Sequence, residues 1–330
     1  MAASTSLACP RIEANPDVTG LGIRISIYVL CLAGRLLTFF VSALARPEPA
    51  ADFARSVRSA LSIQGLALLC TAVYEAAARR LTLFHAVAVL HLLALLGINV
   101  APRGRYTAGR PRAAAARVLA LDAVLLASAA LVFVALSAYV WATAPTFGSQ
   151  PACNAGTVYV VAGVSIRATD RVFRWVVLAT CAAGPAVLLL VLLLGMPCWV
   201  GLCCGHCGKR LGRGASGERD GDGNGDSLSS LSLEDDEREE DPDARLDRLA
   251  NEGLRAAAYT AFSIYAVVSL EQMIDRNNVD REEEQWTFGQ ILAVFLLLGP
   301  AYEFVNVLLA SMGSVRVRRS IRLRRPRRGD

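Results

Sequence analysis

Seven apolar segments, each about as long as a helix that crosses a bilayer, dominate this chain of 330 residues. Such a helix needs roughly twenty apolar residues, and hydrophobic residues make up 54% of the sequence. In a water-soluble protein, this many apolar helices would need far more polar chain to cover them. We therefore predict an all-α, polytopic transmembrane helix bundle with about seven spans, at residues 21–44, 56–78, 81–101, 117–142, 172–195, 255–275 and 286–309.

Charge indicates the orientation of these spans. Arginines concentrate in residues 102–117 and in the tail from Arg316 to Arg328, which holds eight of them. The stretch "NNVDREEEQW" between the last two spans is acidic. Short loops rich in Lys and Arg stay in the cytoplasm, and an odd number of spans puts both basic regions on that side. We expect a multi-pass membrane protein with its N-terminus outside and its C-terminus in the cytoplasm.

This topology divides the chain into five parts. Residues 1–20 form an outer N-terminal segment, and residues 21–195 hold the first five spans with an outer loop at 145–171. Residues 196–251 form a Cys-rich juxtamembrane stretch and a disordered acidic linker, because residues 218–248 carry thirteen Asp and Glu against four Arg. The last two spans lie in residues 252–309, and residues 310–330 form a basic cytoplasmic tail.

The outer loop carries a strand pattern and one cysteine. "TVYVVAGVSI" alternates weakly and predicts a short β-hairpin. Cys153 lies in this loop, and Cys9 lies on the same predicted face. In an oxidising compartment the two thiols can form a disulfide; the alternative is two unrelated thiols.

A second group of cysteines follows the fifth span, in "GMPCWVGLCCGHCGKR". A zinc site is one interpretation, but the adjacent cysteines cannot close a single tetrahedron without strain, and no second ligand pair follows. Juxtamembrane cysteines beside basic residues are typical of reversible palmitoylation. We favour lipidation over metal binding or free thiols for Cys198, Cys203, Cys204 and Cys207.

Three stretches resemble a family of uncharacterised fungal multi-pass membrane proteins. They are "NPDVTGLGIRISIYV" at the first span, "CNAGTVYVVAGVSI" in the outer loop and "YAVVSLEQMIDRNNVDREEEQWTFGQILAVFLLLGP" at the last two spans. The third is the most specific, with its "SxEQMIxRNN" pattern. The resemblance implies a polytopic membrane protein and brings no activity with it.

Ionisable residues inside spans are costly and mark candidate sites. Glu271 and Arg24 fall at matched depth, about one turn below the outer surface, so we predict that they pair, with Gln272 and Gln290 as nearby hydrogen-bond donors. The same depth argument pairs Arg35 with Glu303. The other deep polar candidates are His91, near the midplane, and Asn306, on one stripe with Glu303. Three groups near interfaces are expected to hydrate: Glu75, His85 and Asp122.

Two Gly-Pro pairs predict kinks, Gly184-Pro185 in the fifth span and Gly299-Pro300 in the seventh. The sequence contains no P-loop, no HExxH pair and no nucleophile elbow. We therefore expect a non-enzymatic protein without a metal or cofactor. Its topology is receptor-like, and we expect it to act by binding or signalling through the linker and tail.

The alternative is a transporter or channel for a small solute or ion that uses the intramembrane His, Arg and Glu. We expect a cytoplasmic protein partner at residues 208–251. The arginine tail lies next to a span and lacks interleaved aromatic residues, so it suits anionic lipid headgroups rather than nucleic acid.

Overall fold

The computed structural model describes residues 9, 11–44, 47–99, 112–184 and 242–323 of the chain. Two compact units are present, Met1–Leu178 with Asp247–Asp330, and Ala179–Leu246. The predicted palmitoylation cysteines, the acidic linker and Pro185 lie outside the described residues, as does the side chain of Asp122.

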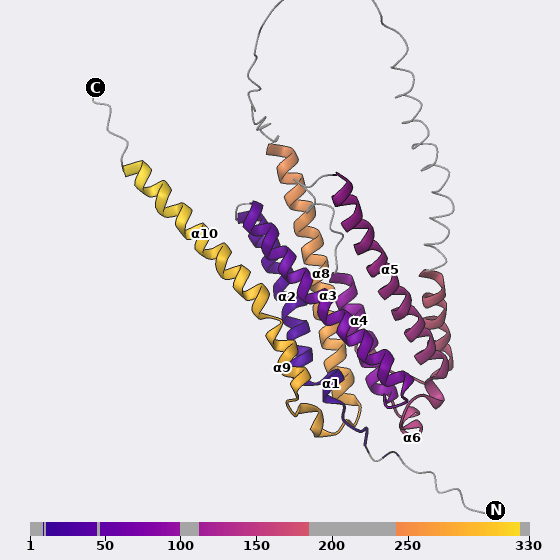
Figure 1. Cartoon of the computed structure of the whole chain (residues 1–330). Coiled ribbons are helices and arrows are strands. Elements are labelled where there is room, and N and C mark those ends of the chain that lie inside the picture. Colours follow the sequence, from indigo (N-terminus) through magenta and orange to yellow (C-terminus); the bar gives the residue numbers. More distant parts are fainter. Residues whose placement is uncertain (1–8, 10, 45–46, 100–111, 185–241, 324–330) are drawn as a thin grey trace, which may run out of the picture. The chain divides into compact units, whose positions relative to one another are not determined.

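Helices make up most of the described chain (Figure 1). The two strands pair only with each other, so the fold is all-α apart from one hairpin. A helical stretch at residues 171–184 follows that hairpin. In chain order the other elements are α1 (Pro16–Thr19), α2 (Leu21–Leu44), α3 (Pro47–Ala77), α4 (Leu83–Asn99), α5 (Arg112–Thr143), η1 (Ala144–Thr146), α6 (Pro151–Asn154), β1 (Val158–Val161), β2 (Val164–Arg167), α8 (Pro242–Arg276), η2 (Arg281–Glu284), α9 (Phe288–Phe295) and α10 (Leu298–Leu323).

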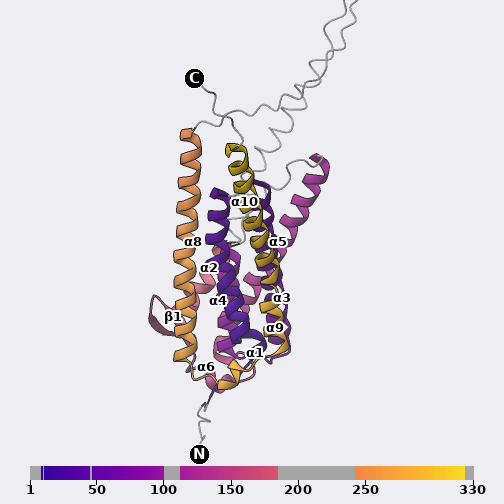
Figure 2. The ribbon, with the colours of Figure 1, turned by 90° about the vertical axis from the view of Figure 1, so that its left-hand side faces the viewer.

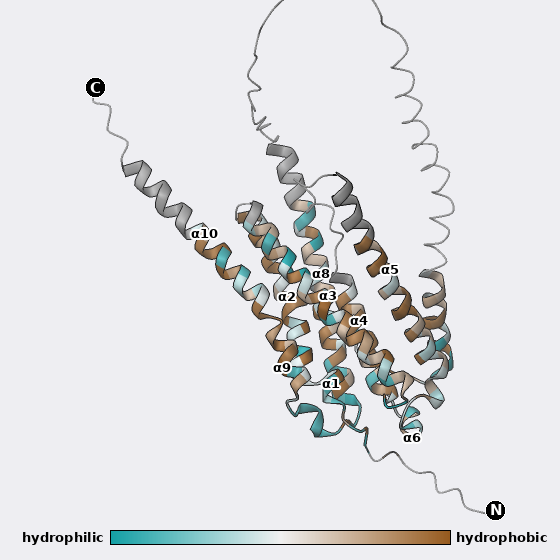
Figure 3. Cartoon of the chain, viewed as in Figure 1, coloured by the Kyte–Doolittle hydropathy of each residue, from teal (hydrophilic) through white to brown (hydrophobic). Residues whose placement is uncertain are grey.

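Five helical segments of the described chain are long and apolar enough to cross a membrane: Pro16–Leu44, Pro49–Ala77, Ala123–Thr146, Ala250–Arg276 and Phe288–Ser311. These segments expose large apolar side chains, as on α5, where Leu125 and Leu131 are more than half exposed. Figure 3 shows by its brown colour that much of α5 is hydrophobic. Such surface suits lipid rather than water. The protein is thus a multi-pass, all-α membrane bundle. The expected count of seven spans stays a prediction, because the third apolar segment is a shorter helix and the fifth is described only to residue 184.

The shorter helix, α4, forms the core of the bundle. Nearly every residue from Leu83 to Leu96 is buried, on all sides of the helix. Its neighbours are α1, α2, α3, α5 and α6. A helix that is apolar all round is expected in such a position, which explains why α4 shows no polar stripe.

The turn between α3 and α4 is tight. Backbone N–H groups of Arg80 and Leu81 both donate to the Glu75 carbonyl, at 2.9 and 3.4 Å. Arg79 takes the left-handed conformation, with φ of 55°. A residue with a Cβ atom adopts it at a cost of about 1 kcal/mol. The surrounding contacts therefore hold Arg79 in a backbone conformation that a residue with a Cβ atom does not favour by itself.

The last apolar segment is broken where the Gly299-Pro300 pair predicts a kink. α9 ends at Phe295 and α10 begins at Leu298. Pro300 has no N–H to donate to the carbonyl four residues earlier, at Leu296, so the helical ladder stops there. α9 packs on α2, where only a glycine at position 22 leaves room for Gln290 and Trp286. α10 packs on α3, with the rings of Phe53 and Phe304 centred 5.7 Å apart.

Short segments close one end of the bundle, and we call it the capped end: residues 9, 11–20, 78–82, 144–170 and 277–287. The predicted hairpin is confirmed, with β1 and β2 antiparallel and a two-residue turn at Ala162 and Gly163. Both turn residues have positive φ, 50° and 79°, as a type I′ turn requires. A disulfide joins Cys9 to Cys153. Ile12 adds a parallel bridge to Val279.

Candidate functional site

Arg24 and Glu271 lie in direct contact, joining α2 to α8. Arg24 Nη1 donates to both carboxylate oxygens of Glu271, at 2.5 and 2.6 Å. Its Nε donates to the Thr19 carbonyl at 2.9 Å, and the Tyr28 hydroxyl donates to Glu271 Oε1 at 2.6 Å. Arg24 is 6% exposed, whereas the Glu271 side chain is 42% exposed. The pair thus consists of a buried cation and a partly solvated anion.

The two glutamines expected beside this pair bond elsewhere. Gln272 Oε1 accepts from Arg276 at 3.4 Å. Gln290 accepts from the Gly22 N–H at 2.8 Å and donates to the Gln285 carbonyl at 2.6 Å. The prediction of Gln272 and Gln290 as donors to the pair is wrong. The groups that complete it are Tyr28 and the Thr19 carbonyl, which are close neighbours of Arg24 in the sequence.

A second buried polar cluster surrounds Glu283, a residue that was not among the predicted site residues. Glu283 is 5% exposed and accepts from the Asn15 N–H at 2.7 Å, from the Thr19 hydroxyl and from His85 Nε2 at 3.2 Å. Burial by itself would raise the pKa of Glu283. The hydrogen bond and the charge of His85, together with the hydrogen bonds from Thr19 and Asn15, outweigh burial and lower the pKa below its ordinary value. The cluster therefore stabilises an ionised carboxylate away from water.

His85 is held in this cluster from both sides. It is fully buried, so the expectation that it hydrates at an interface is wrong. Its Nδ1 lies 2.7 Å from the Thr82 hydroxyl, which also accepts the His85 backbone N–H at 3.3 Å. Thr82 thereby acts as the N-cap of α4. The His85 imidazole joins the start of α4 to η2, and Glu283 in turn joins η2 to the N-terminal segment.

The end of α8 positions the hairpin (Figure 2). Asn277 pairs its side-chain amide with both backbone groups of Val158, at 2.8 Å each. Ser269 donates to the Val160 carbonyl at 2.6 Å, and Arg276 donates to the Gly163 carbonyl at 2.8 Å. These bonds satisfy both backbone groups of Val158 and the carbonyl of Val160 without a third strand. The "SxEQMIxRNN" segment thus supplies the polar side chains that hold the capped end together.

His91 also has protein partners on both ring nitrogens. Nε2 lies 2.9 Å from the Ala266 carbonyl of α8, and Nδ1 lies 3.1 Å from the Tyr159 hydroxyl. A carbonyl only accepts, so the proton belongs on Nε2. Tyr159 packs edge-on against Trp141 and at a tilt against Phe173. Burial and the nearby Tyr265 raise the pKa of Tyr159 to about 12, which keeps its hydroxyl protonated.

The predicted Arg35–Glu303 pair is not formed. The Arg35 guanidinium lies over the Tyr259 ring, 4.7 Å from its centre. Glu303 makes no hydrogen bond or ion pair with the part of the chain that the structure describes. Glu303 and Asn306 are both half-buried on α10. The break before α10 explains the error, because it directs α10 toward α3 while α2 and α8 meet at Arg35.

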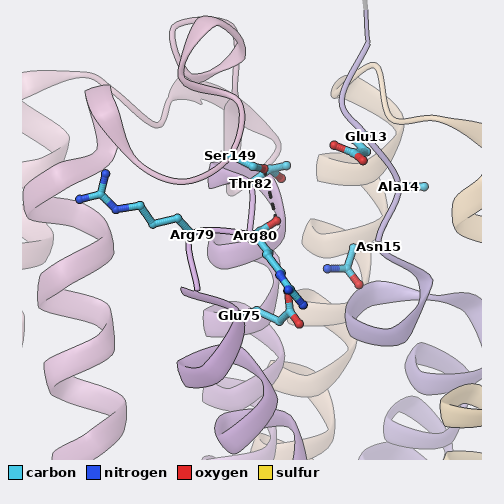
Figure 4. A pocket seen from close by; sticks show the side chains of 8 residues that line it. All are labelled: Glu13, Ala14, Asn15, Glu75, Arg79, Arg80, Thr82 and Ser149. Carbon is cyan, nitrogen blue, oxygen red and sulfur yellow. Dashed lines mark hydrogen bonds between the residues drawn. The ribbon is translucent and has the colours of Figure 1, made fainter. Parts of the chain in front are cut away.

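A polar cavity opens at the capped end, with a volume of about 360 Å³ (Figure 4). The N-terminal segment, the α3–α4 turn and the loop before α6 contribute its walls. Within the described ranges no group of three or more His, Cys, Asp or Glu side chains could hold a metal ion. The cavity is lined by Glu13, Ala14, Asn15, Glu75, Arg79, Arg80, Thr82 and Ser149.

Known protein-family models, curated proteins and solved structures give no match to this chain. The resemblance to fungal multi-pass membrane proteins therefore stays a prediction. The fold and the capped end define the class, a polytopic α-helical membrane protein whose buried charges are bonded chiefly at one end.

Proposed function

We propose that this protein is a non-enzymatic, receptor-like membrane protein that acts by binding and by signalling through its cytoplasmic linker and tail. The observation that carries the proposal is the bonding of His91. A proton or ion path needs groups that can change partners, and His91 is the deepest titratable candidate on α4. Both of its nitrogens are engaged by Ala266 and Tyr159.

The buried cation at the capped end is also held by partners within the protein. Arg24 of α2 is bonded to Glu271 of α8 and to the Thr19 carbonyl of α1. Buried pairs of this kind hold helices in a fixed arrangement more than they add net stability. These polar groups hold α2 and α4 against α8. This arrangement favours a protein whose outer end keeps one conformation.

One observation favours the transporter alternative. Glu303 is half-buried on α10, just past a broken helix, and has no partner among the described residues. Broken helices in transporters often border ion sites. We rank this alternative second because the break has a local cause in Pro300.

Orientation is part of the proposal. The capped end carries the acidic η2, whereas α5 starts and α10 ends in arginine-rich sequence. With the capped end outside, these arginines face the cytoplasm and anionic lipid headgroups. A protease-cleavable tag at the N-terminus should be cut on intact cells, and one after Asp330 should be protected. Two tags on one face would contradict the orientation.

The signalling proposal is tested with the full-length protein in its native cells. Cross-linking mass spectrometry should identify cytoplasmic proteins at residues 208–251. They should be lost when this segment is replaced by a Gly/Ser segment of equal length, with the same amount of protein in the membrane. The same set of cross-links from both proteins would contradict the proposal.

Purified protein in liposomes tests the rival. A receptor-like protein should give the same ion and proton flux as empty liposomes. Coupled uptake that disappears with His91→Ala would overturn the proposed function in favour of transport.

The Cys-rich stretch adds a proposed anchor for the linker. Palmitoylation of Cys198, Cys203, Cys204 and Cys207 would hold the start of the linker at the bilayer. Hydroxylamine-sensitive acyl exchange should label the wild type and not the variant with four serines. Equal labelling of both would exclude lipidation at these positions.

A further inference from the structure

The polar cavity of the capped end has walls that are held in place by backbone contacts. Ser149 donates from its N–H to the Leu81 carbonyl at 3.3 Å and from its hydroxyl to the Arg80 carbonyl at 3.3 Å. Across the cavity, the Glu13 N–H donates to Gln150 at 3.1 Å. A site that is already formed needs little ordering when a ligand enters, so it can bind a small molecule tightly for its size.

The buried cluster behind the cavity fixes its floor. Asn15 donates its backbone N–H to Glu283, and Thr82 contacts His85. Both Asn15 and Thr82 line the cavity. This part of the cavity wall is therefore attached to the buried Glu283 cluster. The Cys9–Cys153 disulfide restrains the chain that precedes Asn15.

The functional groups that face this space are not used by the fold. Within the described chain, the side chains of Glu13, Asn15, Glu75 and Arg80 make no hydrogen bond or ion pair. In Figure 4, Arg80 turns toward Glu75 and Asn15, whereas Arg79 points to the opposite side. The cavity thus presents a guanidinium, carboxylates and an amide, all able to bind a ligand.

Charge complementarity indicates the ligand class. The Arg80 guanidinium and the Glu13 and Glu75 carboxylates all line the cavity, so both signs of charge are present. A ligand of one sign meets attraction and repulsion together. A small zwitterion can place its carboxylate on a guanidinium, which offers paired N–H donors, and its ammonium group on a carboxylate.

We propose that this cavity binds a small zwitterionic amino-carboxylate, with Arg80 on its carboxylate and Glu75 on its ammonium group. The inference rests on the proposed receptor-like function, for which it names the class of ligand. An amino-carboxylate of this kind is either a free amino acid or a short peptide, and the two sources share the chemistry that Arg80 and Glu75 recognise.

The test is calorimetric binding to the full-length protein in lipid nanodiscs. The probes are L-alanine and L-glutamine for free amino acids, L-alanyl-L-alanine for peptides, and propionate and propylamine for single charges. At least one zwitterion should bind, and each single-charge probe should bind at least tenfold more weakly. The stronger of the two zwitterion classes identifies the source of the ligand.

Arg80→Gln should weaken binding of that zwitterion at least tenfold, and so should Glu75→Gln. Arg167→Gln is the matched control, because Arg167 is exposed at the capped end and does not line the cavity, and it should leave binding unchanged. Unchanged thermal unfolding of the three variants excludes a folding defect.

Absence of binding by every zwitterion would overturn the proposal. Equal binding of propionate, or equal losses for Arg167→Gln and Arg80→Gln, would do so as well. The cross-linking and flux experiments use no ligand. A negative calorimetric result therefore leaves the proposed function standing, and a negative cross-linking or flux result leaves the binding result standing.

Discussion

At the capped end, Glu283 joins η2 to α1 and α4 through hydrogen bonds, whereas further along the bundle α3 and α10 meet through the rings of Phe53 and Phe304. Close apolar contact recurs there, as where Gly34 of α2 lies against Val57 of α3. Hydrogen bonds fix direction as well as distance. Packing between helices in lipid gains little from the hydrophobic effect, because lipid tails are as apolar as the side chains.

This difference assigns separate mechanical roles to the two regions. The capped end is expected to keep one geometry, since each buried polar group would lose a partner in any other. The region beyond it can shift with a smaller loss of free energy. A receptor of this design would hold its ligand in a fixed frame and transmit movement through the apolar part.

The largest expected effect is that of removing Glu283, which tests whether hydrogen bonds hold the capped end together. Glu283→Ala should lower the free energy of unfolding by about 3 kcal/mol, because it leaves His85, Thr19 and the Asn15 N–H buried without an acceptor. Denaturant titration in mixed micelles measures it. Glu284→Ala is the matched control, because Glu284 is exposed, and it should change stability by less than about 0.5 kcal/mol. Equal effects would mean that the cluster does not hold the cap.

The next effect concerns the Arg24–Glu271 pair. Glu271→Leu should cost about 2 kcal/mol, because Arg24 stays buried without its counter-charge. A double-mutant cycle with Arg24→Leu should give a coupling on the order of 1 kcal/mol, given the partial exposure of Glu271. The exchange Arg24→Glu with Glu271→Arg should recover part of the loss. The same cycle on Arg35 and Glu303 should give no coupling, and similar values for both pairs would remove the contrast between the regions.

The third effect is the response to acid. The pKa of Glu283 lies below its ordinary value of 4.5 in the folded protein. Its contribution is therefore complete above pH 4.5 and is lost as the pH falls through the lowered value. The wild type should lose stability in this window, and Glu283→Gln should lose less. Parallel curves for the two proteins would show that Glu283 is not the titrating group.

The smallest expected effect lies in the hairpin turn. Ala162 adopts φ of 50°, which glycine adopts without strain, so Ala162→Gly should raise the stability of the hairpin by about 0.5 kcal/mol. Gly163→Ala should lower it by about 1 kcal/mol, because φ there is 79°. Hydrogen exchange of the β1 amide groups reports both changes. Changes in the same direction for the two variants would argue against a type I′ turn.

The sequence predicted correctly those features that depend only on position along the chain or along a helix. Hydropathy located the long helices, and depth along the helices brought Arg24 and Glu271 together. Depth failed for Arg35 and Glu303, since contact also depends on which neighbour a helix faces, and the break at Pro300 changes the neighbour of α10. The sequence predicts the kink, but it does not predict that the kink keeps Glu303 away from Arg35.

The Glu283 cluster could not have been located in this way. Glu282, Glu283 and Glu284 are identical side chains in one acidic run, and the run is typical of a solvated loop. Only the 3-10 turn at residues 281–284 directs the middle carboxylate inward. Partners as far apart as Asn15 and His85 are set by tertiary packing, which leaves no local signal.

The bridge from Ile12 to Val279 has a consequence for synthesis of the chain. Ile12 and Asn15 leave the ribosome long before Val279 and Glu283, their partners, have been made. The N-terminal segment can therefore reach these partners only after the intervening helices have been made. Closure of the cap requires that η2 be present. A chain stopped before residue 278 would leave the N–H groups of Ile12 and Asn15 without these acceptors.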